Sequence, residues 1–253
     1  MTGHNYLVGV LNSQYMDDND RAVITMRSLR EEIEGVLRRV YGSYPLFYYA
    51  GSYGKRTMIR ASFDLDIVIY FPSTERSSLR EIYTSVHRTL LNANYTVNPK
   101  TVSLQLPYKD GFHIDVVPGR AQDSTYRYAT LYKNGEDTTM QTSLKVHIET
   151  IRDSGTRPII KLLKLWKVRH SLDWKTFALE QTVIRALAGQ RKDDYERCLN
   201  IVFEFIRDNI LTIRLVDPAN SNNIIEMPSS IRLTLQGAAV RALNARSWSD
   251  VVW

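Results

Sequence analysis

Two aspartates stand two positions apart in an apolar run of the chain. Asp64 and Asp66 belong to residues 64–71 (DLDIVIYF), whose composition predicts a β-strand. Successive side chains of a strand point to opposite faces, so both carboxylates would lie on one face. Like charges side by side repel each other, and a divalent cation would offset that repulsion. Mg²⁺ suits this role because it takes carboxylate oxygens together with substrate phosphates.

A third carboxylate lies in a second predicted strand, residues 112–117 (FHIDVV). If the two strands are neighbours, Asp115 joins Asp64 and Asp66 on one face. Three acids can hold two metal ions about 4 Å apart, one at the attacking hydroxyl and one at the leaving phosphates. The chemistry would be in-line attack on an α-phosphorus with release of pyrophosphate. His113 lies beside these acids, and we interpret it as a neutral strand histidine.

A glycine and a serine precede the acids. Gly51 and Ser52 end a predicted strand over residues 46–50, and Gly54 and Lys55 follow closely. Glycine lets the backbone approach phosphate oxygens, and the N–H groups of a turn can bind an anion. The Ser52 hydroxyl would reach a β- or γ-phosphate. No G-x-x-x-x-G-K-[ST] pattern is present. A D-x-D pair that stands alone is more often two solvated acids. The prediction of a metal- and phosphate-binding site therefore depends on the order of all these features along the chain.

The elements that position these residues divide the chain into two parts. Before about residue 140, strands alternate with helices predicted over 18–41, capped by Asp18 or Asn19, and 77–91. After it, helical patterns dominate. These fall at 142–152, 158–170, 177–190, 193–209 and 230–245. We therefore predict an α+β fold with a mixed-sheet lobe over residues 1–140 and a helical lobe over 141–253. Residues 119–141 would connect them, and residues 217–223 would form a polar loop.

Composition limits the class of protein. The chain has 253 residues, a net charge of +6 and a single cysteine, Cys198. One thiol excludes an intramolecular disulfide framework and a zinc site built on several thiolates. No apolar run approaches the ~20 residues of a membrane span, and Met1–Tyr6 has no signal-peptide pattern, so we expect a cytoplasmic protein with no membrane partner. The basic excess suits a phosphate-bearing partner without establishing one.

The order Gly51-Ser52, Asp64-Leu65-Asp66, Asp115 resembles the signature of the polymerase-β-like nucleotidyltransferases. Further segments resemble one branch, which holds the oligoadenylate synthases, cyclic GMP-AMP synthase and the bacterial cGAS/DncV-like nucleotidyltransferases (CD-NTases). They cover most of residues 20–245. These segments are TSLKVHIETI at 142–151, RPIIKLLKLWK at 157–167, FALEQTV at 177–183 and VDPANSNNII at 216–225.

The resemblance implies a bilobal fold with the active site in the cleft between the lobes and an N-terminal helix that packs across both. It implies that Asp64, Asp66 and Asp115 hold two Mg²⁺ ions, with Mn²⁺ as an alternative, and that Asp115 helps to activate the acceptor hydroxyl. The implied substrates are nucleoside triphosphates joined into a short cyclic or linear oligonucleotide, a second messenger of anti-phage signalling in bacteria. A protein or nucleic-acid activator stays open.

The same resemblance assigns nucleotide contacts. Gly51, Ser52 and Lys55 would bind the donor triphosphate from the loop, and Lys164 would contact it from the helical lobe. Lys161 shares a helix face with Lys164, because i, i+3 positions are neighbours. Phe177 stands where the oligoadenylate synthases place a tyrosine against the donor base, and its ring can still stack. For Phe177 a core position is an equally good interpretation, and the basic face could simply be solvated.

Two other functions compete with this one. Archaeal-type tRNA CCA-adding enzymes share the acid signature, but they carry further tail domains for which 253 residues leave little room. A catalytically silent nucleotide- or RNA-binding protein is the third alternative, and the three intact acids argue against it.

Overall fold

The computed structural model describes residues 2–109 and 112–253 and contains two compact units that interleave along the chain. The sheet unit comprises residues 16–56 and 63–148. The helical unit comprises the chain up to Tyr15, residues 57–62 and residues 149–253. The boundary at residue 148 falls inside helix α5, Leu144–Ser154. The predicted division at residue 140 stays a prediction.

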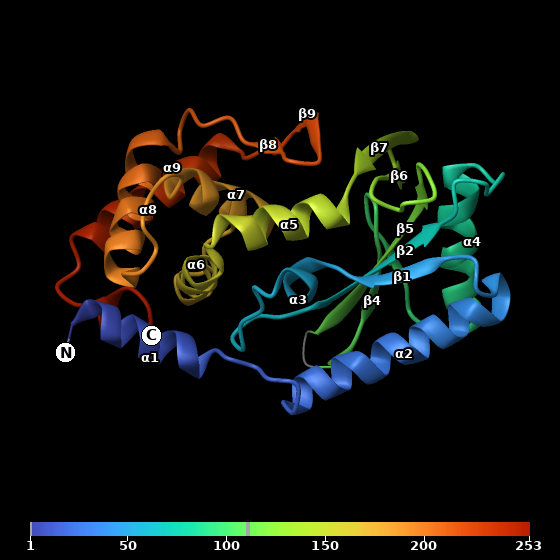
Figure 1. The fold of residues 1–253 in the computed structure, drawn as a ribbon, viewed down its shortest axis with the longest axis horizontal. Coiled ribbons are helices and arrows are strands. Elements are labelled where there is room, and N and C mark those ends of the chain that lie inside the picture. The colour runs from blue at the N-terminus through green and yellow to red at the C-terminus, as the bar shows by residue number, and fades with distance from the viewer. Residues whose placement is uncertain (1, 110–111) are drawn as a thin grey trace. The chain divides into compact units, whose positions relative to one another are not determined.

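The sheet unit is built on one seven-stranded mixed sheet (Figure 1). Its central order is β1-β2-β5-β4-β3, and β6 pairs with β5 and β7. Only the β2–β5 pair among these ladders is parallel. The strands are β1 Leu46–Tyr49, β2 Leu65–Phe71, β3 Asn98–Pro99, β4 Leu104–Pro107, β5 His113–Ala121, β6 Ala129–Lys133 and β7 Thr138–Thr142.

Two long helices of the sheet unit pack on the sheet. Helix α2, Arg21–Tyr41, contacts β2 and α4, and helix α4, Leu79–Asn92, contacts β5 and β6 (Figure 1). The inward face of β2 is fully apolar: Leu65, Ile67 and Ile69 are all buried. Burying such side chains supplies the main favourable term of folding, about 1.5–3 kcal/mol for each. This packing leaves the opposite face of β2, which carries Asp66 and is preceded by Asp64, for the site.

The helical unit has its own core. Trp166 and Phe203, with ring centroids 5.0 Å apart, are among its fully buried aromatic side chains. Its elements are α1 Gly3–Ser13, α6 Arg157–Arg169, α7 Thr176–Ala186, α8 Tyr195–Asn209, β8 Val216–Asp217, β9 Asn220–Ile224, α9 Ser229–Leu243 and the 3₁₀ turn η2 Trp248–Asp250. No helix in the described ranges is both long and apolar enough to cross a membrane.

Several predicted boundaries were wrong. Helix α2 begins at Arg21, and its cap is Asp20, which accepts a hydrogen bond from the Ala22 N–H, instead of Asp18 or Asn19. Helix α1 was not predicted. The predicted connector 119–141 contains the β6–β7 hairpin, and the predicted polar loop contains the β8–β9 hairpin. Both hairpins are rich in polar residues with little apolar alternation, so the periodicity signal for strands is weak there.

Candidate active site

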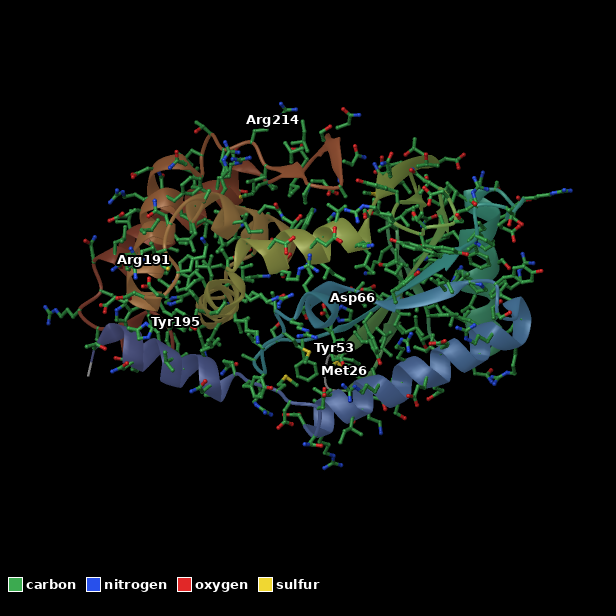
Figure 2. The ribbon with its side chains drawn as sticks, viewed as in Figure 1. Met26, Tyr53, Asp66, Arg191, Tyr195 and Arg214 are labelled. Atoms are coloured by element: carbon green, nitrogen blue, oxygen red, sulfur yellow. The ribbon has the colours of Figure 1, made fainter. Side chains whose placement is uncertain are left out.

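The register of β2 against β5 brings the predicted acids together. Asp66 is the lateral partner of Asp115 in this parallel pair. Asp64 precedes Asp66 by two residues and therefore shares its face. In Figure 2 Asp66 lies beside the short helix α3, which carries Tyr53. The sequence prediction required the strands of Asp66 and Asp115 to be neighbours, and β2 and β5 are neighbours.

The carboxylates of Asp64 and Asp115 converge on one imidazole. His113 Nε2 lies 3.5 Å from Asp115 Oδ2 and 3.8 Å from Asp64 Oδ2. The other oxygen of Asp115 accepts a hydrogen bond of 2.9 Å from Ser103 Oγ. Asp115 is mostly buried, whereas Asp64 is 40% exposed. One acid is thus held in place by its neighbours and the other is open to solvent.

The carboxylate of Asp66 lies directly against the backbone of Gly51. Gly51 has φ +52°, and a Cβ atom built on it would stand 1.5 Å from Asp66 Oδ2. The main chains are joined as well, because the Ala50 N–H donates to the Asp66 carbonyl at 2.9 Å. Only glycine combines this backbone conformation with the absence of a side chain. The glycine of the predicted phosphate loop is therefore required by the position of the second acid.

The predicted loop is a short helix, α3, Gly51–Lys55. Its Ser52 side chain is buried, and the Oγ atom has no hydrogen-bond partner among the described residues. Leaving a buried hydroxyl unpaired costs about 1–3 kcal/mol. An unpaired hydroxyl beside the acids is consistent with a ligand oxygen as its missing partner.

Helix α2 holds α3 from within the sheet unit. Arg27 Nε donates a 3.0 Å hydrogen bond to Tyr53 Oη, and the rings of Tyr49 and Tyr53 lie 4.6 Å apart. Arg30 places its guanidinium carbon 4.5 Å from the centre of the Tyr49 ring. These contacts secure the helix that carries Ser52.

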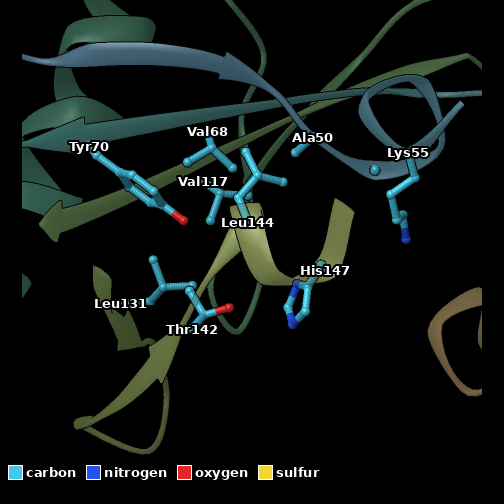
Figure 3. A pocket seen from close by; sticks show the side chains of 10 residues that line it. Ala50, Lys55, Val68, Tyr70, Val117, Leu131, Thr142, Leu144 and His147 are labelled. Carbon is cyan, nitrogen blue, oxygen red and sulfur yellow. The ribbon is translucent and has the colours of Figure 1, made fainter. Parts of the chain in front are cut away.

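A small pocket continues the acid face. After Asp66 and Asp115, the next residues on this face are Val68 and Val117, which both line the pocket. Its volume is about 130 Å³. Figure 3 shows Tyr70, Val68, Val117 and Leu131 along one part of the wall and Lys55 and His147 at another. Burial raises the pKa of Tyr70 well above its usual value, opposed by a hydrogen bond from the Leu144 backbone.

The other predicted nucleotide contacts belong to the helical unit. Lys164 is buried, and its Nζ donates to the Thr57 carbonyl at 3.0 Å. Lys161 Nζ lies 6.0 Å from the Tyr15 ring centre, and burial, aided by Arg157, lowers the pKa of this lysine. Phe177 packs against the core of that unit. The roles of these three residues in nucleotide binding stay predictions.

The acid face suits a divalent cation by its donor chemistry. Three carboxylates offer the hard oxygen ligands that Mg²⁺ prefers, and the unpaired Ser52 hydroxyl lies on the helix whose Gly51 touches Asp66. Within the described ranges, no three or more His, Cys, Asp and Glu side chains are gathered, as they stand, so that they could hold a metal ion. Binding therefore requires side-chain rotation within an otherwise suitable donor set.

One contact of the site was not foreseen. Ser103 carries no motif, and only the β4–β5 pairing brings it to Asp115. His113 lies beside the acids, as its i−2 spacing from Asp115 predicts.

The architecture is that of a known class of nucleotidyltransferases. No family model and no curated protein matches the chain. Solved structures of CD-NTases match it along nearly its whole length, which confirms the predicted α+β nucleotidyltransferase fold. At identities below 20% this likeness shows the fold.

Three of these structures illustrate the match. Vibrio cholerae DncV, a cyclic AMP-GMP synthase, is 15% identical, with a TM-score of 0.73 over 99% of this chain and 93% of that one. CdnC of E. coli MS115-1, solved with ATP, is 18% identical, with a TM-score of 0.73 over 96% of this chain and 91% of that one. CdnE of Elizabethkingia meningoseptica, a cyclic dinucleotide synthase solved with GTP and Apcpp, is 15% identical, with a TM-score of 0.73 over 96% of this chain and 98% of that one.

Proposed function

We propose that this chain is a nucleotidyltransferase that joins ribonucleoside triphosphates into a short cyclic or linear oligonucleotide. The observation that carries the proposal is the lateral pairing of Asp66 with Asp115, with Asp64 on the same face and Gly51 against Asp66. The similar structures support it, because DncV is described as a cyclic AMP-GMP synthase and CdnE as a cyclic dinucleotide synthase.

In the proposed reaction, an acceptor hydroxyl attacks the α-phosphorus of a donor triphosphate. The new bond joins the hydroxyl oxygen to that phosphorus, the bond to the bridging oxygen of the β-phosphate breaks, and pyrophosphate leaves. Asp115, whose Oδ1 is held by Ser103, would help to activate the acceptor hydroxyl, and the hydroxyl proton would leave to solvent. Ser52 Oγ donates to a donor phosphate, which would satisfy its unpaired hydroxyl.

Asp64, Asp66 and Asp115 would hold Mg²⁺, which when bound would neutralise phosphate charge and lower the pKa of the acceptor hydroxyl. The pocket beyond the acids would hold part of a nucleotide. Its volume of about 130 Å³ is close to that of a cavity that accepts one benzene ring, and whole-ligand pockets are larger. We further propose that the product is a cytoplasmic second messenger of anti-phage signalling.

A mass-spectrometric product screen tests this function. The full chain is incubated with Mg²⁺ or Mn²⁺ and the four ribonucleoside triphosphates, beside a double variant, Asp64→Ala/Asp66→Ala. The matched control is Asp208→Ala, which removes an exposed carboxylate on α8 that pairs with Arg207.

We expect a new oligonucleotide species and pyrophosphate from the wild type and the control, and neither from the double variant. The same product from the double variant would contradict the proposal. Transfer to tRNA, with no product from nucleotides alone, would favour the CCA-adding alternative. Nucleotide binding without pyrophosphate release in every condition would favour a catalytically silent binding protein.

A further inference from the structure

His113 stands within the acid face as a fourth polar side chain. It precedes Asp115 by two residues on β5, so both point to the same side of the sheet. Leu65 pairs with Ile114, which places Asp64 next to His113 at the edge of the ladder. Along the strands, the face therefore carries two successive pairs of side chains, Asp64 with His113 and then Asp66 with Asp115.

His113 lies near two of the three carboxylates of the face. Nε2 is 3.5 Å from Asp115 Oδ2 and 3.8 Å from Asp64 Oδ2, longer than the 2.7–3.2 Å of a normal N–H···O hydrogen bond. Two ligands of an octahedral ion, each bound at about 2.1 Å, lie about 3 Å apart at right angles and about 4 Å apart across the ion. The observed distances lie between these two values, and within the described residues the side chains as they stand do not surround an ion, so binding of one cation by all three atoms requires the side chains to rotate.

The orientation of Asp115 favours this arrangement. Ser103 Oγ binds Oδ1, which leaves Oδ2 as the oxygen nearer His113. Hydrogen bonds of this kind commonly fix the orientation of metal ligands. Ser103 is in turn held at its carbonyl by Tyr83 Oη at 3.0 Å. The imidazole is 34% exposed, so it is open to an incoming ion.

We propose that His113 is a nitrogen ligand of the divalent cation held by Asp64, Asp66 and Asp115, and that it shifts the metal preference of the site from Mg²⁺ toward Mn²⁺. The proposal rests on the proposed function, which supplies the metal site. Mg²⁺ favours all-oxygen coordination, whereas imidazole suits later divalent metals, and affinity for nitrogen-containing sites rises along the series that begins with Mn²⁺. A site of three carboxylates and one imidazole should therefore discriminate against Mg²⁺ more than a site of three carboxylates.

Pulsed electron paramagnetic resonance of Mn²⁺ tests this directly. The full chain is loaded with Mn²⁺ and inorganic tripolyphosphate, which supplies phosphate oxygens and no nitrogen. The variant is His113→Phe, which keeps a planar ring, and the control is His87→Phe, on helix α4. Mn²⁺ and Mg²⁺ affinities are measured in parallel by calorimetry, and Asp66→Asn reports whether the ion occupies the acid face.

We expect ¹⁴N modulation of the Mn²⁺ signal in the wild type and in His87→Phe and its loss in His113→Phe. Mn²⁺ affinity should fall about tenfold or more in His113→Phe, with a change of less than about threefold for Mg²⁺. Bound Mn²⁺ that is sensitive to Asp66→Asn but shows no ¹⁴N modulation would overturn the role of His113 alone. Equal loss of both metals would also overturn it, because that result indicates a structural role. Mn²⁺ binding that is absent or insensitive to Asp66→Asn would overturn the metal site and with it the proposed function.

Discussion

Gly51 is the residue at which the site tolerates least change. Replacement by alanine would put Cβ 1.5 Å from Asp66 Oδ2 in a backbone at φ +52°. Either the carboxylate or the backbone must move, so we predict that Gly51→Ala lowers the free energy of unfolding by about 1–3 kcal/mol and reduces product formation at least about a hundredfold. Chemical denaturation and a pyrophosphate assay measure the two effects.

The matched control for this prediction is Gly35→Ala in helix α2 of the same unit, where an added Cβ meets nothing within 4 Å. A glycine inside a helix is worse than alanine by about 0.5–1 kcal/mol, so this change should stabilise the chain and leave activity intact. A Gly51→Ala variant that is as stable and active as Gly35→Ala would show that Asp66 does not need its observed position.

The acids themselves could be predicted because their spacing encodes their geometry. Asp64 and Asp66 share a face by the period of two in a strand, and the parallel pairing of β2 with β5 then brought Asp115 to Asp66. Ser103 could not be predicted, because its contact with Asp115 joins residues 12 apart through a turn with no motif. Residues within one strand are related by local geometry, whereas residues on different strands are related only by register.

At the scale of elements, helix α4 supports strand β5, which carries Asp115, through the phenol of Tyr83. Tyr83 Oη donates to the carbonyls of Lys100 and Ser103, each at 3.0 Å, and Ser103 Oγ donates to Asp115. Burial raises the pKa of Tyr83 from 10.0 to about 12, with a smaller opposing contribution from the Lys100 backbone. The buried phenol is therefore neutral at pH values where the phenol of the unfolded chain is ionised.

The sign of the pH effect follows from this raised pKa. The contribution of Tyr83 to stability is complete below pH 10 and is lost as pH rises from 10 toward about 12. We predict that the free energy of unfolding falls more steeply over this range in the wild type than in Tyr83→Phe. Tyr83→Phe should also cost about 1 kcal/mol at neutral pH through the lost hydrogen bonding. Thermal unfolding across the pH series measures both.

For this series the control is Tyr44→Phe, whose side chain is 73% exposed. It should keep the wild-type slope. Identical slopes in Tyr83→Phe and the wild type would mean that the phenol is not buried in solution.

The predicted end of strand β5 was wrong. The strand was expected over residues 112–117, and Pro118, which cannot donate to a ladder, follows directly. The strand continues to Ala121 because its outer partner changes at this point, from β4, which pairs up to Val116, to β6, which pairs from Gly119. Pro118 lies between the residues that pair with the two outer partners. Sequence periodicity cannot locate such a change of partner.

At the scale of the whole molecule, the chain leaves the sheet unit between Ser52 and Asp64. Residues 57–62 belong to the helical unit, where Lys164 Nζ donates to the Thr57 carbonyl at 3.0 Å. In the same segment, the Ala61 N–H donates a 3.0 Å hydrogen bond to the side-chain oxygen of Gln14. The helical unit thus holds residues 57–62, which lie within the connection (residues 56–64) between the predicted phosphate-binding helix α3 and strand β2.

This arrangement predicts that Lys164 is a structural residue of that unit whatever its role toward a nucleotide. Lys164→Met should lower the free energy of unfolding by about 1.5–3 kcal/mol, the usual contribution of a hydrogen bond from a charged group. It should also speed amide hydrogen exchange across residues 57–62, because the Thr57 carbonyl loses its partner. Lys175→Met, at an exposed lysine of the same unit, is the control and should do neither. If Lys164→Met reduced nucleotide affinity while stability and exchange at 57–62 stayed at wild-type values, the lysine would act on the triphosphate alone, and the hydrogen bond to Thr57 would contribute nothing to the segment.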